Sequence, residues 1–321
     1  MGERQAKIVA KKYELLEMVG QGGMASVWRA RLVDDTDQIV AVKKIKPQHR
    51  RSESYQSMFI EEARVGALVN HPNIVKVIDF CVDEHDDHYL IMEWIDGLDL
   101  GSFCDAFIKS RKETPWPIVV AVCAEAMHGL SAAHNRVVGA AATPIIHRDV
   151  SPHNILIDVS GAVKLTDFGL ARSQDRVYSL TKPGTVKGKA SFLAPEQTRG
   201  EPATFQTDIF SAGIVLWESL AGQRLFDKPS VLEILQQIRK GDITPLTSVR
   251  KGLPTQLVNV VNKALAFKPE NRYQSAAALA EALQQVLVDE GETVDADELG
   301  RQVTDARARI AARRDKNRVP R

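Results

Sequence analysis

The stretch Ile146-His147-Arg148-Asp149-Val150-Ser151-Pro152-His153-Asn154 is followed, thirteen residues after Asn154, by the triplet Asp167-Phe168-Gly169. Pro152 keeps the first stretch from becoming helical, because proline lacks the backbone N–H that a helix interior needs. The apolar run Ile155-Leu156-Ile157 then predicts a short buried strand. We therefore expect Asp149 and Asn154 to lie together on a loop where this strand begins.

A second apolar run, Val163-Lys164-Leu165, ends just before Asp167. The turn-forming residues Asp158-Val159-Ser160-Gly161 between the two runs predict a hairpin, which would bring Asp167 back beside Asn154. An amide and a carboxylate are oxygen ligands of the kind that Mg²⁺ prefers. The spacing therefore predicts a magnesium site at Asn154 and Asp167.

Together these motifs resemble the catalytic core of protein kinases, specifically the eukaryotic-like serine/threonine kinases found in bacteria, over roughly residues 13–289. The resemblance implies a bilobal α+β fold. Its N-lobe (13–93) would hold a small antiparallel β-sheet with one main helix, followed by a hinge (93–97) and a larger helical C-lobe (97–289). It also implies that Asp149 accepts the proton of the substrate hydroxyl, while Asn154 and Asp167 hold Mg²⁺, or Mn²⁺, on the phosphates of ATP.

The nucleotide site would begin at Val19-Gly20-Gln21-Gly22-Gly23-Met24-Ala25-Ser26-Val27. Closely spaced glycines between two strands let backbone N–H groups approach phosphate oxygens, because no Cβ obstructs them. The alternative for this motif alone is a plain hairpin turn. It departs from the kinase pattern because Ala25 replaces the third glycine. The resemblance assigns nucleotide contacts to Val19, Gly20, Gln21, Gly22, Gly23, Met24 and Val27.

Lys43 ends the strand-like run Val40-Ala41-Val42-Lys43, sixteen residues beyond Val27. A lysine after three apolar residues could simply extend its ammonium into solvent. The resemblance instead implies that Lys43 reaches the α and β phosphates and is oriented by a helix carboxylate. Glu62 has the family's spacing for that role, and Glu61 competes with it. Successive helix positions point about 100° apart, so only one of the two can face the site.

The stretch Met92-Glu93-Trp94-Ile95 resembles the kinase hinge, where backbone groups bind adenine. By this resemblance Met92, Glu93 and Ile95 line the nucleotide site, with the Met92 side chain as its back wall. Val27, Ala41 and Leu156 would sandwich the purine. The alternative is that these apolar residues belong to an ordinary core.

The chain departs from the serine/threonine kinase pattern at a position with a catalytic role. A lysine is usual two residues after the catalytic aspartate, where it neutralises charge on the transferring phosphoryl group, and Ser151 stands there instead. Downstream, Gly188-Lys189 replaces the family's Gly-Thr. We hypothesise an exchange in which Lys189 reaches back from the segment before Ala194-Pro195-Glu196 and supplies the charge that Ser151 cannot. The alternative is that Lys187 and Lys189 merely extend into solvent.

The remaining pattern predicts strands first and long helices later. Strands are expected at residues 15–19, 26–32, 39–45, 75–81 and 89–92, with a helix at 55–68. After Asp96-Gly97 the pattern favours helices, including 116–134 and an almost wholly apolar helix at 209–220. By resemblance Glu196 pairs with Arg272, and Asp208 braces the catalytic loop.

Residues 290–321 lie outside the resemblance. Asp295 precedes Glu298 by three, as in a helix cap, and apolar residues then recur at helical spacing, namely Leu299, Val303, Ala306 and Ile310. Residues 301–321 also carry eight Lys or Arg against two Asp, a local net charge of +6. We expect an amphipathic basic tail helix that packs on the helical lobe or docks on a partner, and the sequence does not choose between these.

Composition excludes several classes of protein. A net charge of +1 over 321 residues gives no basic footprint for nucleic acid. The three cysteines, Cys81, Cys104 and Cys123, have no ligand-like spacing, which argues against a disulfide framework or zinc site. No uninterrupted run of eighteen apolar residues and no signal-peptide core occur. We expect a cytoplasmic chain without a membrane span.

Three functions remain open. The leading hypothesis is an ATP-dependent protein serine/threonine kinase acting on Ser/Thr hydroxyls of proteins. The second is a pseudokinase or scaffold, motivated by Ser151 and Ala25, and the third is a small-molecule phosphotransferase, disfavoured by the long segment ending in Ala194-Pro195-Glu196. The resemblance implies that Arg148 pairs with a phosphorylated residue of that segment, between Asp167 and Glu196. The candidates are Ser173, Tyr178, Ser179, Thr181 and Thr185, of which Thr181 and Thr185 are favoured.

Overall fold

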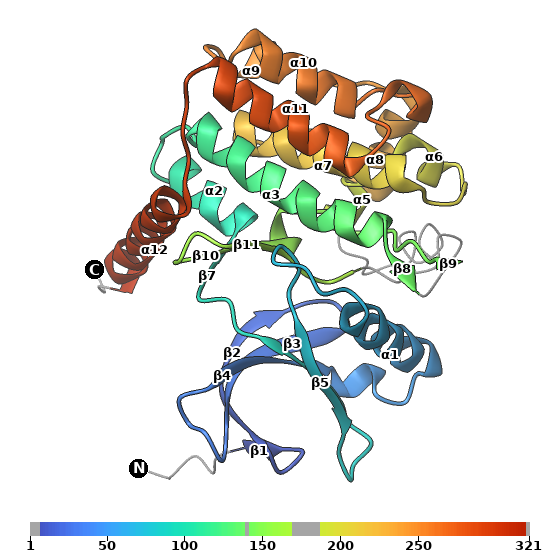
Figure 1. Cartoon of the computed structure of the whole chain (residues 1–321), viewed down its shortest axis with the longest axis vertical. Coiled ribbons are helices and arrows are strands. Elements are labelled where there is room, and N and C mark those ends of the chain that lie inside the picture. The colour runs from blue at the N-terminus through green and yellow to red at the C-terminus, as the bar shows by residue number, and fades with distance from the viewer. Residues whose placement is uncertain (1–6, 139–140, 169–186, 319–321) are drawn as a thin grey trace. The chain divides into compact units, whose positions relative to one another are not determined.

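The computed structural model of the chain describes residues 7–138, 141–168 and 187–318. The chain divides into two compact units, residues 1–95 and 96–321. Each unit has its own hydrophobic core. Figure 1 shows strands and one long helix in the first unit and mostly helices in the second.

Unit 1 contains a six-stranded antiparallel sheet in the order β1-β2-β3-β4-β6-β5. Its strands are β1 (Lys7–Val9), β2 (Tyr13–Gln21), β3 (Ala25–Leu32), β4 (Ile39–Ile45), β5 (Val77–Val82) and β6 (His88–Glu93). A single-turn 3₁₀ helix (Pro47–His49) leads into α1 (Glu53–Ala67). All five predicted strands and the predicted helix are confirmed, with boundaries shifted by a few residues. The short strand β1 was not predicted.

Strand alternation explains the core of unit 1. Val40 and Val42 of β4 point to the same side of the sheet as Ile91 of β6 and Ala30 of β3, and all four are almost completely buried. Tyr13 and Tyr89 complete this cluster. The opposite side of β4 carries Ala41 and Lys43, so one short run supplies both a core face and a functional face.

Unit 2 is built around long helices, which are α2 (Leu100–Ile108), α3 (Trp116–His134), α7 (Phe205–Ala221), α8 (Val231–Lys240), α10 (Thr255–Ala264), α11 (Ala276–Asp289) and α12 (Ala296–Arg318). Shorter helices are α5 (Lys187–Ala190), α6 (Pro195–Thr198), α9 (Leu246–Val249) and the 3₁₀ turns Pro152–Asn154 and Pro269–Asn271. The predicted helices at 116–134 and 209–220 are confirmed as α3 and α7. Helix α3 packs against both α7 and α11.

Helix α3 is long and apolar enough to cross a membrane by length and composition, with a mean hydropathy of 1.3 over its most apolar window. Inspection of uninterrupted apolar runs had not flagged it. In the structure 67% of that window is buried, as expected for a core helix. Among the described residues no other helix passes this test.

The second unit also holds the predicted hairpin. Strands β10 (Ile155–Asp158) and β11 (Val163–Leu165) pair antiparallel, with Ile155 opposite Leu165, which confirms the predicted pairing. A third strand, β7 (Gly97–Asp99), adds to β10 and was not predicted. Gly97 is required there, because a Cβ at this position would lie 1.8 Å from the carbonyl oxygen of Ile157. Two short strands, β8 (Val137–Val138) and β9 (Ala141–Ala142), form a separate hairpin.

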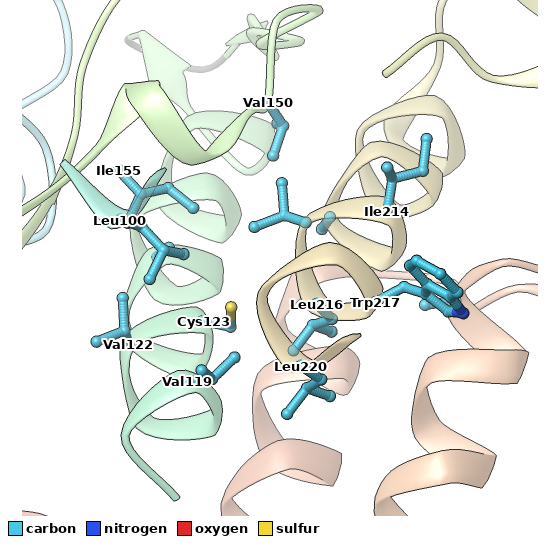
Figure 2. Packing of buried hydrophobic residues seen from close by; sticks show 14 of the residues in the cluster. Leu100, Val119, Val122, Cys123, Val150, Ile155, Ile214, Leu216, Trp217 and Leu220 are labelled. Atoms are coloured by element: carbon cyan, nitrogen blue, oxygen red, sulfur yellow. The ribbon is translucent and has the colours of Figure 1, made fainter. Parts of the chain in front are cut away.

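The hairpin is anchored in the main core. Figure 2 shows Val150 and Ile155 directed toward the cluster that side chains of α3 and α7 fill, including Val122 and Leu216. Val150 has no exposed surface and directly follows Asp149. Burial of this side chain therefore anchors one point of the loop that carries the candidate catalytic aspartate.

The predicted tail helix forms as α12 and packs on unit 2, where it contacts α2, β7 and β10. Its buried hydrophobic residues are Leu299, Val303 and Ala306. The carboxylate of Asp295 accepts from the backbone N–H of Glu298 at 2.8 Å, which confirms the predicted cap. Of the two alternatives left open by the sequence, the structure shows the first.

Candidate active site

The first group of candidate residues lies in unit 1 and centres on an ion pair. Nζ of Lys43, on β4, lies 2.5 Å from Oε1 of Glu62, on α1, and both side chains are buried. Glu61 instead pairs with Arg64 on the exposed side of the helix, with Nε and Oε2 at 2.7 Å. Between the two glutamates that the sequence offered, the structure therefore brings Glu62 to the lysine.

Sheet register gathers the apolar candidates around this lysine. Val27 of β3 lies opposite Lys43, and Ala41 of β4 lies opposite Met92 of β6. Since alternate residues of a strand share a face, all four side chains lie on the side of the sheet that carries the ion pair. Ala41 and Met92 are buried there. This arrangement presents an apolar surface beside a cation, which suits a purine attached to phosphates.

The glycine loop is a tight hairpin between β2 and β3. The backbone N–H of Gly22 donates to the carbonyl of Ala25 at 2.9 Å, and Gly20 lies opposite Val27. A Cβ at Gly23 would meet nothing within 4 Å inside the protein. Packing within the described chain therefore does not explain glycine at position 23. A close approach by a ligand would explain it.

The hinge candidates end unit 1. The backbone N–H of Glu93 donates to the Lys76 carbonyl at 3.0 Å, and Oε1 of Glu93 accepts from the Lys76 N–H at 2.7 Å. Ile95 is the last residue of the unit and is half-buried. Leu156, the remaining adenine candidate, belongs to unit 2, where it lies on β10 opposite Asp99.

The second group of candidates lies in unit 2, around the loop 147–154. Nδ2 of Asn154 donates to the backbone carbonyl of Asp149 at 2.8 Å and lies 3.4 Å from its Oδ2. This brings the predicted base and the predicted metal ligand together. Because the amide nitrogen faces Asp149, the amide oxygen is the atom of Asn154 that suits a cation.

Buried Asp208 holds the loop's backbone, as the resemblance implied. Its two carboxylate oxygens accept from the backbone N–H groups of His147 and Arg148, both at 2.8 Å. His134 contacts the same carboxylate at 2.8 Å. Arg148 has φ of 64°, in the left-handed region that non-glycine residues rarely adopt, so these bonds hold a strained conformation.

His147 links the loop to the segment before Asp167. Burial lowers the pKa of its imidazole, which favours the neutral ring. Nε2 lies 3.1 Å from the Thr166 carbonyl and therefore carries the proton, while Nδ1 accepts from the backbone N–H of Asp149 at 3.2 Å. The sequence analysis gave His147 no role. Its place between two motifs was a signal, but its partners depend on the tertiary fold.

Asp167 lies at the end of the hairpin. The N–H of Thr166 donates to the Asn154 carbonyl at 3.0 Å, which places Asp167 next to the Asn154 strand end. Asp167 has φ of 57°, a second strained residue at this site. An amide oxygen and a carboxylate at one strand end match the oxygen donors that Mg²⁺ prefers, so the residues present fit the metal.

Lys189 lies where the exchange hypothesis required. Its Nζ is 2.9 Å from Oδ2 of Asp149, and the aspartate side chain is 12% exposed against 60% for the lysine. Ser151 precedes the 3₁₀ turn Pro152–Asn154 and cannot supply a positive charge. The structure thus brings the two predicted residues together, whereas their roles in catalysis belong to the proposal below.

A buried ion pair fixes the segment that follows Lys189. Arg272 donates to both carboxylate oxygens of Glu196, at 2.8 and 2.9 Å, which confirms that predicted pair. Burial alone would raise the pKa of Glu196, but the hydrogen bonds and charge of Arg272 outweigh burial and lower it. The candidates Ser173, Tyr178, Ser179, Thr181 and Thr185 lie outside the described residues.

Two further ion pairs near the loop were not predicted. Nδ1 of His153 lies 2.7 Å from Oδ1 of Asp99, which also caps α2 by accepting from the Ser102 N–H at 2.9 Å. Arg224 pairs with Glu218 of α7 at 3.1 Å. Asp99 directly precedes an apolar helix, so its role as a helix cap could have been predicted from the sequence. The pairing of Glu218 with Arg224 could not, because the surrounding pattern indicates only an apolar helix.

Comparison with known proteins supports what this geometry suggests. The protein kinase domain family matches residues 13–286. The tyrosine-protein kinase MasK of Myxococcus xanthus is 36% identical over 86% of this chain and 43% of its own length. The serine/threonine-protein kinase PknB of Mycobacterium tuberculosis is 37% identical over 90% of this chain and 44% of its own. The chain thus spans less than half the length of these relatives.

Solved structures agree on the fold. The kinase domain of Mycobacterium tuberculosis PknI superposes with a TM-score of 0.64 and 22% identity, over 89% of this chain and 100% of that one. At this identity the likeness speaks for the fold alone. It confirms the predicted α+β bilobal fold class. The family model matches residues 13–286, most of the sequence, and so this chain belongs to the protein kinase domain family.

Proposed function

We propose that this chain is an ATP-dependent protein serine/threonine kinase, which transfers the γ-phosphoryl group of ATP to Ser or Thr hydroxyls of proteins. The observation that carries the proposal is the 2.9 Å contact between Lys189 and Asp149. Ser151 was the main reason to suspect an inactive protein, and this contact supplies a cation beside the candidate base. Relatives named as serine/threonine kinases support the same conclusion.

In the proposed reaction Asp149 accepts the proton of the acceptor hydroxyl as its oxygen bonds to the γ-phosphorus. The bond from that phosphorus to the bridging oxygen breaks, and ADP leaves. Lys189 offsets the negative charge of the transferring group, and Lys43, oriented by Glu62, binds the α and β phosphates. Magnesium, or manganese, held by Asn154 and Asp167, would neutralise phosphate charge.

Autophosphorylation of the segment before Glu196 forms part of the proposal. Within the described part of the chain, Nε of Arg148 is buried without a hydrogen-bond partner. A buried guanidinium nitrogen of this kind suits a phosphate oxygen, and Thr181 and Thr185 are the favoured acceptors. Mass spectrometry after incubation with ATP tests this, and an unmodified segment in a fully active enzyme would refute it.

The direct test is phosphate transfer from radiolabelled ATP with Mg²⁺ to a generic protein substrate, by wild type and Asp149→Asn. We expect transfer by the wild type. In the variant the rate of transfer should fall by about 10²–10⁴-fold, which is the usual contribution of a general base to the rate. No transfer by folded wild type would favour the pseudokinase alternative. Faster transfer to small alcohols than to proteins would favour the small-molecule phosphotransferase.

Acceptor type needs its own measurement, because one relative is named a tyrosine-protein kinase. Phosphoamino-acid analysis of the labelled product separates phosphoserine and phosphothreonine, which we expect, from phosphotyrosine. Cytoplasmic location and a docking role for the basic tail are further parts of the proposal. Fluorescence microscopy of a tagged chain and pull-down with and without residues 290–321 test them.

A further inference from the structure

Two exposed cations, Lys189 and Arg224, lie at the two ends of the short segment 189–192. Arg224, in the loop after α7, places its guanidinium carbon 5.7 Å from the ring centre of Phe192. Lys189 lies three residues before Phe192 and contacts Asp149 at 2.9 Å. We call Arg224 and Lys189 the cationic rim.

Each cation of the rim is held by a carboxylate that is itself hidden from solvent. The Arg224 side chain is 44% exposed and its partner Glu218 only 7%, while for Lys189 and Asp149 the values are 60% and 12%. The backbone N–H of Leu225 also donates to Glu218 at 3.1 Å, which fixes the loop. A ligand that approaches from solvent therefore meets the positive members of both pairs.

The two sides of the rim are joined rigidly. Oγ of Ser191 donates to the carbonyl of Phe226 at 3.0 Å, so the loop of Arg224 and the segment of Lys189 move together. His153 belongs to the loop that carries Asp149 and Ser151. The hydrogen bond that His153 donates to Asp99 raises the pKa of its imidazole, and the nearby charge of Arg224 acts against this rise.

Glu218 does not fully cancel the charge of Arg224. Burial raises the pKa of Glu218 to about 7, although Arg224 and the Leu225 N–H act to lower it. Near neutral pH the carboxyl is consequently protonated in part of the molecules, whereas a guanidinium stays charged. The Arg224 guanidinium is therefore only partly neutralised by Glu218, whose pKa the nearby charge of Asp227 also raises.

We propose that the cationic rim selects acceptor peptides that carry an anionic side chain, a carboxylate or a phosphate, beside the acceptor hydroxyl. The inference rests on the proposed kinase function and names its substrate class. Arg224 is the specificity-determining residue, since its planar fork suits both anions, and Lys189 also serves the transfer itself. Exposed ion pairs contribute about 0.2–1 kcal/mol each, so the expected selectivity is a few-fold.

The test compares threonine peptides that differ only beside the acceptor, with Asp, phosphoserine, Ala or Lys at the flanking positions. For wild type we expect kcat/KM for the Asp and phosphoserine peptides to exceed that for the Ala peptide by about 2- to 5-fold, mainly through KM, with the Lys peptide poorest. In Arg224→Gln this preference should fall toward the Ala value while turnover of the Ala peptide stays unchanged. Equal use of Asp and Lys peptides by wild type, or an unchanged preference in the variant, overturns the inference.

Arg199→Gln is the matched control. Arg199 is 41% exposed, pairs with Glu201 at 2.7 Å and lies 5.8 Å from the Phe267 ring, so it shares the exposure and the ring contact of Arg224, although Glu201 is 52% exposed. We expect this variant to keep the wild-type preference. A thermal melt of both variants confirms that neither loses its fold, and a preference lost equally in both contradicts the assignment to Arg224.

Peptide binding to wild type without nucleotide, followed by fluorescence anisotropy, separates the two levels of inference. If every peptide is phosphorylated at the same rate, the proposed selectivity is wrong but the kinase function is not contradicted. If no peptide is phosphorylated but the anionic peptides bind more tightly, the anion preference of the cationic rim is supported and the kinase function is contradicted. A response to phosphoserine but not to Asp assigns the rim to phosphate, and a response to both assigns it to anions in general.

Discussion

At the scale of single residues, the chain offers a matched pair of neighbouring glutamates. Glu62 faces Lys43 in a buried ion pair, whereas Glu61 faces solvent and Arg64. We expect Glu62→Gln to lower kcat/KM by about 10²-fold, because Lys43 loses the charge that orients it. Glu61→Gln should leave kcat/KM within about twofold, since exposed pairs contribute little. Steady-state kinetics with a protein substrate measures both, and equal losses would show that Glu62 has no special part.

Lys189 and Ser151 allow a test by exchange. If Lys189 supplies the transition-state cation, Lys189→Ala should lower kcat by about 10²–10³-fold, and adding Ser151→Lys to that variant should restore part of the rate. Lys251, an exposed lysine that donates to the Thr247 carbonyl at 2.7 Å, gives the control variant Lys251→Ala. A Lys189→Ala enzyme with full turnover would end the exchange hypothesis.

Glu218 predicts how stability depends on pH. Burial raises the folded-state pKa of this carboxyl from 4.5 to about 7, so between these values the folded protein binds the proton more tightly than the unfolded chain. The contribution of this carboxyl to stability is therefore fully present below about pH 4.5 and is lost as pH rises through about 7, by at most roughly 3 kcal/mol. Urea unfolding from pH 5 to 8 should show a flatter profile for Glu218→Gln, and a wild-type profile for Glu201→Gln, whose carboxylate is 52% exposed.

At the scale of elements, the sequence was most informative where one local pattern decides the outcome. The β-branched and apolar run in residues 39–45 and the apolar faces in 116–134 matched β4 and α3 to the residue. Strands β1 and β7 escaped because each spans three residues and is stabilised by its neighbour rather than by its own composition. In the candidate site, Lys43, Asp149 and Asn154 were visible through spacing. The partners of His147 and Asp99 were not, because Thr166 and His153 come from other elements of the fold.

Helix α12 meets the β10–β11 hairpin so closely that side chains are excluded. A Cβ at Gly300 would lie 2.3 Å from the carbonyl oxygen of Val159, and one at Gly161 would lie 1.9 Å from that of Ala296. Arg307 also pairs with Asp96, at the start of unit 2, at 3.0 Å. This hairpin joins Asn154 to Asp167. Helix α12, which lies outside the kinase family match, therefore supports the hairpin that carries the candidate metal ligands.

This contact reverses the usual sign of a substitution. Glycine to alanine inside a helix normally stabilises it by about 1 kcal/mol. Gly300→Ala should instead destabilise the protein by about 1–3 kcal/mol, because the new methyl group overlaps the Val159 backbone. The reverse change at exposed Ala308, Ala308→Gly, calibrates ordinary helix propensity and should cost about 1 kcal/mol. Thermal unfolding measures both, and a stabilised Gly300→Ala variant would show that the close approach does not persist in solution.

At the scale of the whole molecule, the candidate residues are divided between two separately packed units. Lys43, Glu62 and the glycine loop belong to residues 1–95, whereas Asp149, Asn154, Asp167 and Lys189 belong to residues 96–321. The second unit has its own large core, and the Glu196–Arg272 pair and the Asp208 bonds lie wholly within it. Its internal order therefore does not depend on the first unit, but its proposed chemistry does.

A fragment of residues 96–321 tests this division. We expect it to unfold in one cooperative thermal transition, because its apolar core and buried ion pair are complete. It should transfer no phosphate from ATP, since the groups proposed to bind the α and β phosphates are missing, and isothermal calorimetry should detect much weaker ATP binding than for the full chain.

Glu196→Gln in the fragment should lower its melting temperature, because Arg272 would stay buried without its counter-charge. A fragment that phosphorylates protein would show that unit 1 is dispensable, and a fragment without a transition would show that the fold of unit 2 needs its neighbour.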